Sequence, residues 1–288
     1  MCSIRKCGER CGKIWRSDAM NSSESLDCPI IDGHTHLGLE AFIVKPIPEA
    51  KQQRPAFRDR MENRYEALIE RLDCNQVDQA VAFPFPLEEV DTETANRYVL
   101  EASQAYPERI IPFVLIGDRI EYWLQQGARG VKQHFLMAPD RFDLSTAYRA
   151  IAEAGVPLIA HLTTREGPGI PAQIRAIRQM APTLTLIVAH MGRRVPNTGE
   201  GVEEHLAELR EMEQVYLETS TVREPQTIAT AVEVLGDERI VYGSDFPFNS
   251  YLDADPMAVE LETIRQAQLP SSSLARVLGG NLARCLGS

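Results

Sequence analysis

The chain has 288 residues, of which 44% are hydrophobic and 25% are charged, as in an ordinary globular protein. Its formal net charge of -11 argues against binding to nucleic acid or to an anionic membrane surface, so a small-molecule partner is expected. No apolar run approaches the about 18 residues that a membrane helix needs, and the basic N-terminus lacks the apolar core of a signal peptide. We therefore expect a cytoplasmic protein.

The chain changes character at about residue 27. Residues 1–27 mix Cys, Arg, Lys, Ser and Asn without a period and predict a flexible tail. Residues 28–288 are expected to form a single domain in which apolar runs alternate with helical patterns. The predicted strands are 30–38, 77–85, 109–116, 130–134, 156–161, 184–190, 215–219 and 240–245. The predicted helices are 56–73, 94–106, 119–126, 144–153, 170–180, 201–212, 227–235, 256–268 and 272–278. Residues 40–55 are rich in proline and predict a lid or a pocket wall.

Eight short strands, each followed by a helix, predict a parallel sheet with crossover helices. A closed (β/α)8 TIM barrel accommodates all eight strands in a length close to its typical size of about 250 residues. A doubly wound open sheet is the alternative. The sequence disfavours it, because no G-x-G-x-x-G motif follows any predicted strand.

Histidines gather at the ends of the predicted strands. In a TIM barrel the catalytic groups lie at the C-terminal strand ends. Of the chain's six histidines, only His205 falls in a predicted helix. The other five lie at predicted strand ends, which are also the positions of Lys132 and Asp245: His34, His36, His134, His161 and His190. Because His34 and His36 are two residues apart on an extended strand, their imidazoles lie on the same face.

Four of these side chains make a candidate metal site: His34, His36, His161 and Asp245. Three imidazole nitrogens and one carboxylate oxygen suit Zn2+ with positions left open for water and substrate, and Mn2+ is the alternative metal. His190, one strand further round, is then expected to act as an acid or base. Taken alone, His161 or His190 would be interpreted as a hydrogen-bonded core histidine.

The sequence resembles the amidohydrolase superfamily, and most closely its amidohydrolase-2 branch. That branch holds metal-dependent hydrolases and the aminocarboxymuconate semialdehyde and resorcylate decarboxylases. The resemblance rests on His34-x-His36, His161-Leu162-Thr163, Ala189-His190-Met191-Gly192, Gly243-Ser244-Asp245-Phe246-Pro247 and Gly280-Asn281-Leu282-Ala283-Arg284, and covers residues 30–286. It implies the same four metal ligands and a catalytic histidine at His190.

Lys132 leaves the number of metals open. In binuclear amidohydrolases a lysine on the fourth strand, carboxylated by CO2, bridges two metals. Gly-Val-Lys-Gln-His around Lys132 matches that position only loosely. We expect a mononuclear site. The alternatives for Lys132 are a carbamate bridge, a contact with a substrate carboxylate, or packing of its stem in the barrel mouth.

Two reactions suit the same ligands. The expected function is hydrolysis of an ester, lactone or amide, with Asp245 or His190 taking the proton. The alternative is non-oxidative decarboxylation of a small carboxylic acid, for example an aromatic or unsaturated one. A barrel that binds without turnover is disfavoured, because a buried ring of polar groups without an ion would be costly. The predicted loops and lid carry cations that suggest an anionic substrate: Lys45, Arg54, Arg165, Arg193, Arg194 and Arg223. A homodimer is compatible with the sequence, which marks no interface.

Overall fold

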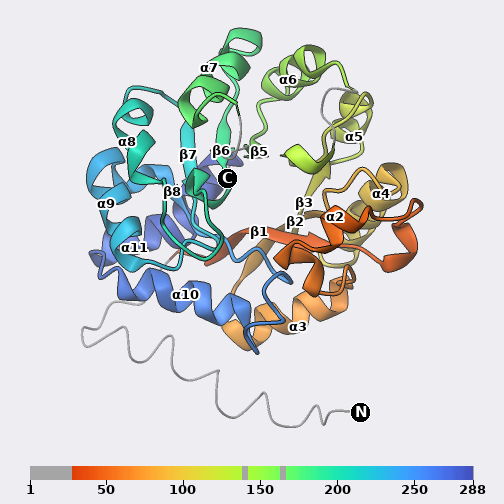
Figure 1. The fold of residues 1–288 in the computed structure, drawn as a ribbon, viewed down its shortest axis with the longest axis horizontal. Coiled ribbons are helices and arrows are strands. Elements are labelled where there is room, and N and C mark those ends of the chain that lie inside the picture. The colour runs from red at the N-terminus through yellow and green to blue at the C-terminus, as the bar shows by residue number, and fades with distance from the viewer. Residues whose placement is uncertain (1–27, 138–141, 163–166, 288) are drawn as a thin grey trace.

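The structure is a computed structural model that describes residues 28–137, 142–162 and 167–287. Eight parallel strands follow one another in chain order around a barrel, with helices outside (Figure 1). The strands are β1 (Ile31–Leu37), β2 (Gln79–Pro84), β3 (Ile110–Leu115), β4 (Gly130–His134), β5 (Leu158–His161), β6 (Leu186–Val188), β7 (Val215–Glu218) and β8 (Ile240–Val241). The predicted TIM barrel is therefore confirmed. The predicted tail, residues 1–27, lies outside the described residues.

Helices cover the outside of the barrel. The α-helices are α2 (Glu49–Gln52), α3 (Tyr65–Asn75), α4 (Thr92–Ala105), α5 (Ile120–Gln125), α6 (Leu144–Glu153), α7 (Ile170–Met180), α8 (Glu203–Arg210), α9 (Pro225–Leu235), α10 (Pro256–Gln266), α11 (Ser271–Ala275) and α12 (Asn281–Cys285). Short 3-10 turns cover Glu40–Phe42, Pro55–Arg58, Phe135–Met137, Ala189–Gly192 and Asp237–Arg239, and Arg276–Gly280 is a π-helical turn. In the described part of the chain, none of the helices combines the length and apolar character required to cross a bilayer.

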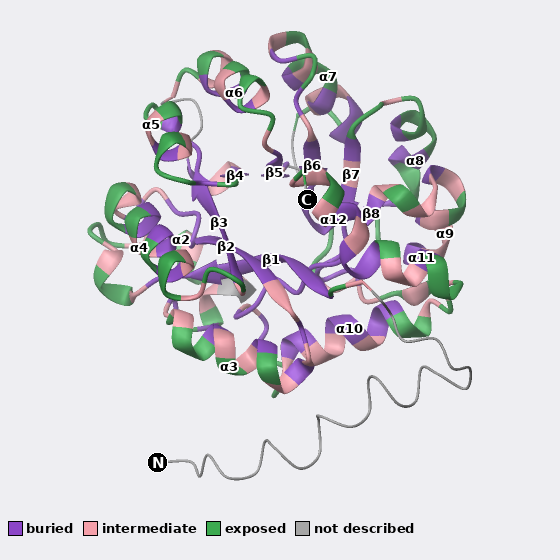
Figure 2. Cartoon of the chain, turned by 180° about the vertical axis from the view of Figure 1, so that it is seen from behind, coloured by how far each residue is buried: buried purple, intermediate pink, exposed green. Residues whose placement is uncertain are grey.

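The strands are buried on both faces, which explains their nearly continuous apolar sequences (Figure 2). On β2, Val81 and Phe83 point into the barrel, whereas Ala80 and Ala82 pack beneath the surrounding helices. A Cβ atom at Gly130 would lie 2.2 Å from the ring of Phe113. Only glycine therefore leaves room for this phenylalanine to fill the barrel interior.

The chain that follows β8 pairs with β1 where the candidate ligands lie. The backbone N–H of Asp245 donates to the carbonyl of His34 at 2.8 Å, and that of His36 donates to the carbonyl of Phe246 at 2.7 Å. Asp32 bridges the same seam, because its Oδ1 accepts from the backbone N–H groups of His34 and Ser244 at 2.9 and 3.0 Å. The seam therefore brings the H-x-H motif beside Asp245.

Several element bounds differ from the prediction. The sixth strand was expected to reach residue 190, but β6 ends at Val188 and His190 takes a left-handed φ of 56° within a turn. The eighth strand was expected to reach residue 245, but β8 ends at Val241 and Asp245 has a φ of 60°. The predicted helix 56–73 begins only at Tyr65, and α12 was not predicted. Apolar periodicity does not report these turns, because their residues stay buried after the strand has ended.

Candidate metal centre

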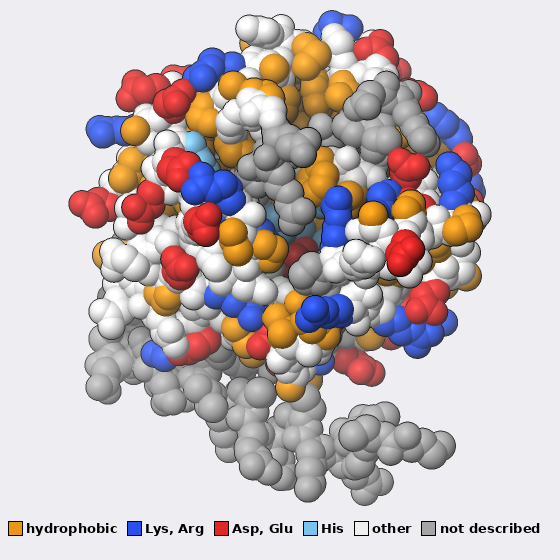
Figure 3. Space-filling view, in the orientation of Figure 1, with side chains coloured by type: hydrophobic (Ala, Val, Ile, Leu, Met, Phe, Trp, Pro, Cys, Tyr) orange, Lys and Arg blue, Asp and Glu red, His pale blue; other side chains and the backbone are white. Residues whose placement is uncertain are grey.

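One cavity opens at the C-terminal ends of the strands. Its volume is about 170 Å³, and its lining includes all five histidines that the sequence places at strand ends. Aromatic side chains form much of the remaining wall: Phe57, Phe85, Phe135, Phe248 and Tyr251. Figure 3 looks onto this face, where histidine surface is visible near the centre and basic side chains lie around it. His205 lies apart on α8, as its predicted helical position requires.

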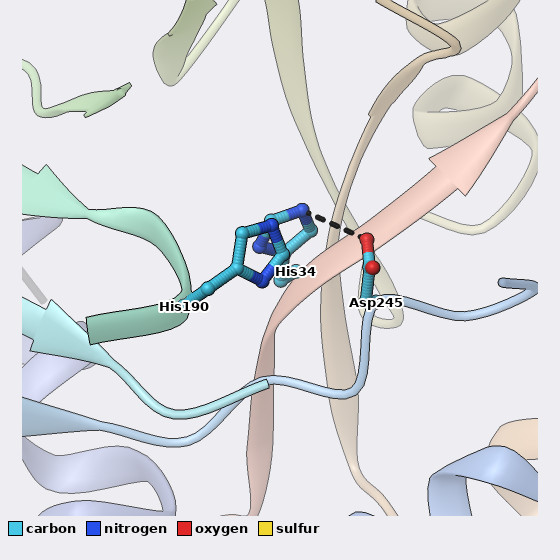
Figure 4. Close-up of side chains that lie close together, drawn as sticks. All are labelled: His34, His190 and Asp245. Carbon is cyan, nitrogen blue, oxygen red and sulfur yellow. Dashed lines mark ion pairs between the residues drawn. The ribbon is translucent and has the colours of Figure 1, made fainter. Parts of the chain in front are cut away.

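Asp245 lies between the two histidines of the H-x-H motif. Its Oδ1 is 3.2 Å from Nε2 of His34 and 3.0 Å from Nε2 of His36. His190 joins them, since His34, His190 and Asp245 each place a possible ligand atom within 4.8 Å of the others (Figure 4). Donors from segments far apart in the sequence therefore lie close together.

His161, which the sequence also predicts as a ligand, lies next to His190 but outside this group of three donors. The rings of His161 and His190 are 4.5 Å apart, and the rings of His134 and His161 are 4.2 Å apart. The group of three donors thus contains the predicted acid or base His190 but not His36 or His161. The proposed ligand set of His34, His36, His161 and Asp245 stays a prediction.

Sequence reasoning missed Glu218, the last residue of β7. Its side chain is fully buried, and its Oε2 lies 2.6 Å from Nδ1 of His34. The same carboxylate accepts from Ser220 and from the backbone N–H of His190. The available signal was a carboxylate in the predicted strand 215–219, one residue before its end at Thr219.

Lys132 is fully buried in the barrel mouth. Its Nζ lies 3.2 Å from Nε2 of His34 and 4.7 Å from the ring centroid of Phe83. Burial lowers the pKa of Lys132 to about 8, although the carboxylates of Asp245 and Glu218 oppose this shift. A lysine with such a pKa is easier to deprotonate than an exposed one. Both carbamate formation and packing of an uncharged side chain require the neutral amine.

The electrostatics keep most of the histidines neutral and the aspartate ionised. Burial lowers the pKa of His36 to about 4 and holds those of His134, His161 and His190 well below the ordinary histidine value. Burial would raise the pKa of Asp245, but His34 and His36 outweigh it and hold that pKa well below its usual range. Neutral imidazoles and a carboxylate are the protonation states that ligate metals.

The surroundings of His34 also fit a cation. Carboxylate oxygens of Glu218 and Asp245 lie 2.6 and 3.2 Å from its two ring nitrogens. Burial and Lys132 disfavour the charged imidazole, but these two carboxylates outweigh them and raise the pKa of His34. Two buried carboxylates on either side of one ring require positive charge nearby. With nitrogen and oxygen donors converging there, the residues fit a divalent metal ion.

Only some of the predicted basic residues line the cavity. Arg54 and Arg193 line the cavity, and Arg194 lies at its exposed edge in an ion pair with Glu204. Arg223 lies in ion pairs with Asp253 and Glu260, and it does not line the cavity. Lys45, within the predicted lid or pocket wall of residues 40–55, does not line the cavity either, and Arg165 falls outside the described residues.

Solved structures share this fold at low sequence identity. A putative 2-pyrone-4,6-dicarboxylic acid hydrolase from Pseudomonas putida is 20% identical, with a TM-score of 0.70 over 90% of this chain and 98% of that chain. The 5-carboxyvanillate decarboxylase of Sphingomonas paucimobilis is 18% identical, with a TM-score of 0.66 over 90% and 99%. The Novosphingobium aromaticivorans 5-carboxyvanillate decarboxylase, complexed with manganese and 4-hydroxy-3-methoxy-5-nitrobenzoic acid, is 15% identical, with a TM-score of 0.62 over 93% and 98%.

The sequence itself carries a family signature over the whole barrel. A comparison with curated proteins finds no match. The amidohydrolase family model, in contrast, matches residues 31–287, which run from β1 to beyond α12 and include every candidate ligand described above. The chain therefore belongs to the amidohydrolase family, in its amidohydrolase-2 branch.

Proposed function

We propose that this protein is a metal-dependent hydrolase that cleaves an ester, lactone or amide bond in a small anionic substrate. The observation that carries the proposal is the pairing of an ionised Asp245 with a neutral His190 at the floor of one cavity, within 4.8 Å of each other. Hydrolysis needs one group to take a proton from water and another to deliver a proton to the leaving group.

The predicted ligands His34, His36, His161 and Asp245 would hold the metal. A divalent ion held there supplies Lewis acidity, which favours ionisation of water and polarises a carbonyl oxygen. The solved structure of the Novosphingobium decarboxylase, which contains manganese, supports a divalent ion in this branch.

The residues themselves account for the proton transfers. The Asp245 carboxylate accepts the proton of the attacking water, because its low pKa keeps it ionised. His190 keeps Nδ1 against Ser220, at 2.9 Å from its hydroxyl oxygen, which leaves an unprotonated Nε2. This Nε2 takes the proton from Asp245 and passes it to the leaving oxygen or nitrogen. The elements of water are thereby added across the cleaved bond.

The cavity limits the substrate. Its volume of about 170 Å³ is close to that of a cavity that binds benzene, about 150 Å³, so a single substituted ring or a short chain fits. Arg193 and Arg54 place positive charge on its wall, which favours an anionic group on the substrate.

One observation favours decarboxylation as a second candidate function. The ring of Phe85 stacks on His36 at 5.6 Å with an interplanar angle of 4°, and Phe248 meets His36 edge-on at 4.8 Å. Such flat aromatic walls suit an aromatic acid. The structural neighbours include both a hydrolase and decarboxylases, so they do not favour one reaction.

A labelling experiment separates the two reactions. Protein loaded with zinc or manganese is incubated in 18O-labelled water with a panel of aryl esters, lactones, anilides and aromatic carboxylic acids. Hydrolysis incorporates 18O into the product carboxyl group, whereas decarboxylation releases CO2 and leaves the organic product unlabelled. Release of CO2 together with an organic product that contains no 18O would overturn the hydrolase proposal. The Asp245→Asn protein measures the background.

A further inference from the structure

Glu218 holds the most heavily hydrogen-bonded carboxylate near the metal centre. Its Oε2 lies 2.6 Å from Nδ1 of His34, 2.9 Å from the hydroxyl of Ser220 and 3.2 Å from the backbone nitrogen of His190. Its Oε1 accepts from the backbone N–H of Ser220. Burying a carboxylate costs free energy, which an apolar side chain of similar volume would avoid. The hydrogen bonds of Glu218 are therefore needed to offset that cost.

The contact with Glu218 determines where neutral His34 carries its proton. An ionised carboxylate can only accept, so the hydrogen bond at 2.6 Å requires a proton on Nδ1 of His34. In neutral His34, Nε2 is therefore unprotonated. That nitrogen faces Asp245 Oδ1 at 3.2 Å, on the side of the ring where a metal would bind.

Glu218 is also connected to His190 by hydrogen bonds through Ser220. The Ser220 hydroxyl donates to Glu218, so its oxygen is left to accept from Nδ1 of His190 at 2.9 Å. The Ser220 carbonyl, which can only accept, lies 3.2 Å from the same Nδ1. His190 is thus also protonated on Nδ1 and presents an unprotonated Nε2.

We propose that Glu218 is a positioning residue that fixes the tautomers of His34 and His190 together, so that both present Nε2 to the metal centre. One carboxylate thereby links a predicted metal ligand on β1 to the predicted acid or base after β6. The inference rests on the proposed metal site, and it assigns to Glu218 a role that is separate from ligation and from proton transfer.

Gly243 provides an independent sign that the backbone is built around this carboxylate. A Cβ atom at Gly243 would lie 2.3 Å from Oε1 of Glu218 and 2.8 Å from Cβ of His34. The glycine of the G-S-D-F-P motif therefore lets the chain after β8 close over Glu218 and His34.

The test compares two buried glutamates. Glu218→Gln removes the charge and puts a donor on the carboxamide, so it cannot accept from all the groups that now surround Glu218. We expect the zinc dissociation constant of the purified protein to rise about 10- to 100-fold. Glu260→Gln is the matched control, because Glu260 is also almost fully buried but contacts Arg223 and the backbone of Thr221. It should leave zinc affinity unchanged.

Tautomers provide a readout that does not depend on activity. Histidine labelled with 15N is observed by NMR in the metal-free protein at alkaline pH, where imidazoles are neutral. In the wild type, His34 and His190 should both be protonated on Nδ1. Glu218→Gln should change both signals, Ser220→Ala should change His190 alone, and Glu218→Asp should restore part of the zinc affinity.

The outcomes separate this inference from the proposed function. Wild-type His34 or His190 protonated on Nε2 would overturn the inference, even if Glu218→Gln failed to fold. Unchanged zinc affinity and unchanged tautomers in Glu218→Gln would overturn it as well, while leaving the hydrolase proposal intact. A wild type that binds no divalent metal would instead overturn the proposed function, and the NMR signals would still test the tautomers.

Discussion

Nε2 of His36 lies 3.0 Å from Oδ1 of Asp245, although the two residues are 209 positions apart in the sequence. They meet because the chain leaving β8 hydrogen-bonds to β1 on both sides of this contact. The carboxylate of Asp245 also reaches His34. This one side chain therefore joins both histidines of the H-x-H motif, and removing its charge is the most direct test of the site.

Asp245→Asn keeps the shape of the side chain and removes its charge. We expect turnover to fall by about 10²- to 10⁴-fold, because the proton acceptor is lost, and metal content to fall with it. Steady-state kinetics and elemental analysis on the same preparation check both. Turnover at the wild-type rate would remove Asp245 from the mechanism.

Two histidine substitutions distinguish ligand from acid or base. His161→Ala should lose most of the bound metal and all turnover, whereas His190→Asn should keep the metal and lose turnover. The comparison is informative because His190, rather than His161, shares the group of close donors with His34 and Asp245. A His190→Asn protein without metal would make His190 a ligand, and full metal content in His161→Ala would exclude His161.

Substitution of Lys132 tests whether the predicted site holds one metal or two. With a mononuclear site, elemental analysis after purification with bicarbonate should give about one metal per chain in both the wild type and Lys132→Met. Two metals in the wild type and fewer in the variant would instead support a carbamate bridge on Lys132. Either result can be interpreted, because Nζ of Lys132 lies 3.2 Å from Nε2 of His34, a predicted metal ligand.

Arg193 is expected to bind the charged group of the substrate. Its guanidinium lines the cavity, where its Nε donates to the hydroxyl of Thr221 at 2.9 Å. Arg193→Met should raise KM about 10- to 100-fold for a substrate that carries a carboxylate, with a smaller effect on its neutral amide analogue. Arg194→Gln, at the exposed edge of the cavity, is the control. Equal effects on both analogues would contradict this role.

His205 predicts part of the pH dependence of stability. Burial lowers its pKa below 6.5, although its hydrogen bond to the Met191 carbonyl at 2.8 Å opposes this. The unfolded chain therefore takes up this proton more readily. The contribution of His205 is present above pH 6.5 and is lost as the pH falls through its lower pKa in the folded protein.

His205→Gln keeps an N–H donor but does not titrate. The free energy of unfolding, measured with urea at neutral pH and at about pH 5, should fall less on acidification in this variant than in the wild type. An equal fall in both proteins would show that His205 does not contribute.

The sequence was sufficient to predict the barrel and the gathering of five histidines at its mouth. Apolar runs of strand length indicate buried strands, and the strand ends then share one face. It did not predict Glu218, because a lone glutamate in a strand shows neither its direction nor its partners. The turns at His190 and Asp245 were also missed, since left-handed backbone at non-glycine residues is set by tertiary contacts.

The pairing of β1 with the chain after β8 predicts when, during synthesis and folding, a metal can be bound. The ribosome makes His34 and His36 early. It makes Asp245, whose carboxylate completes their predicted site, 209 residues after His36. Contacts between such distant segments form late in folding, because a long loop must close first. We therefore expect a metal to be loaded late in folding, and in refolding experiments zinc uptake should lag behind the recovery of helical circular dichroism.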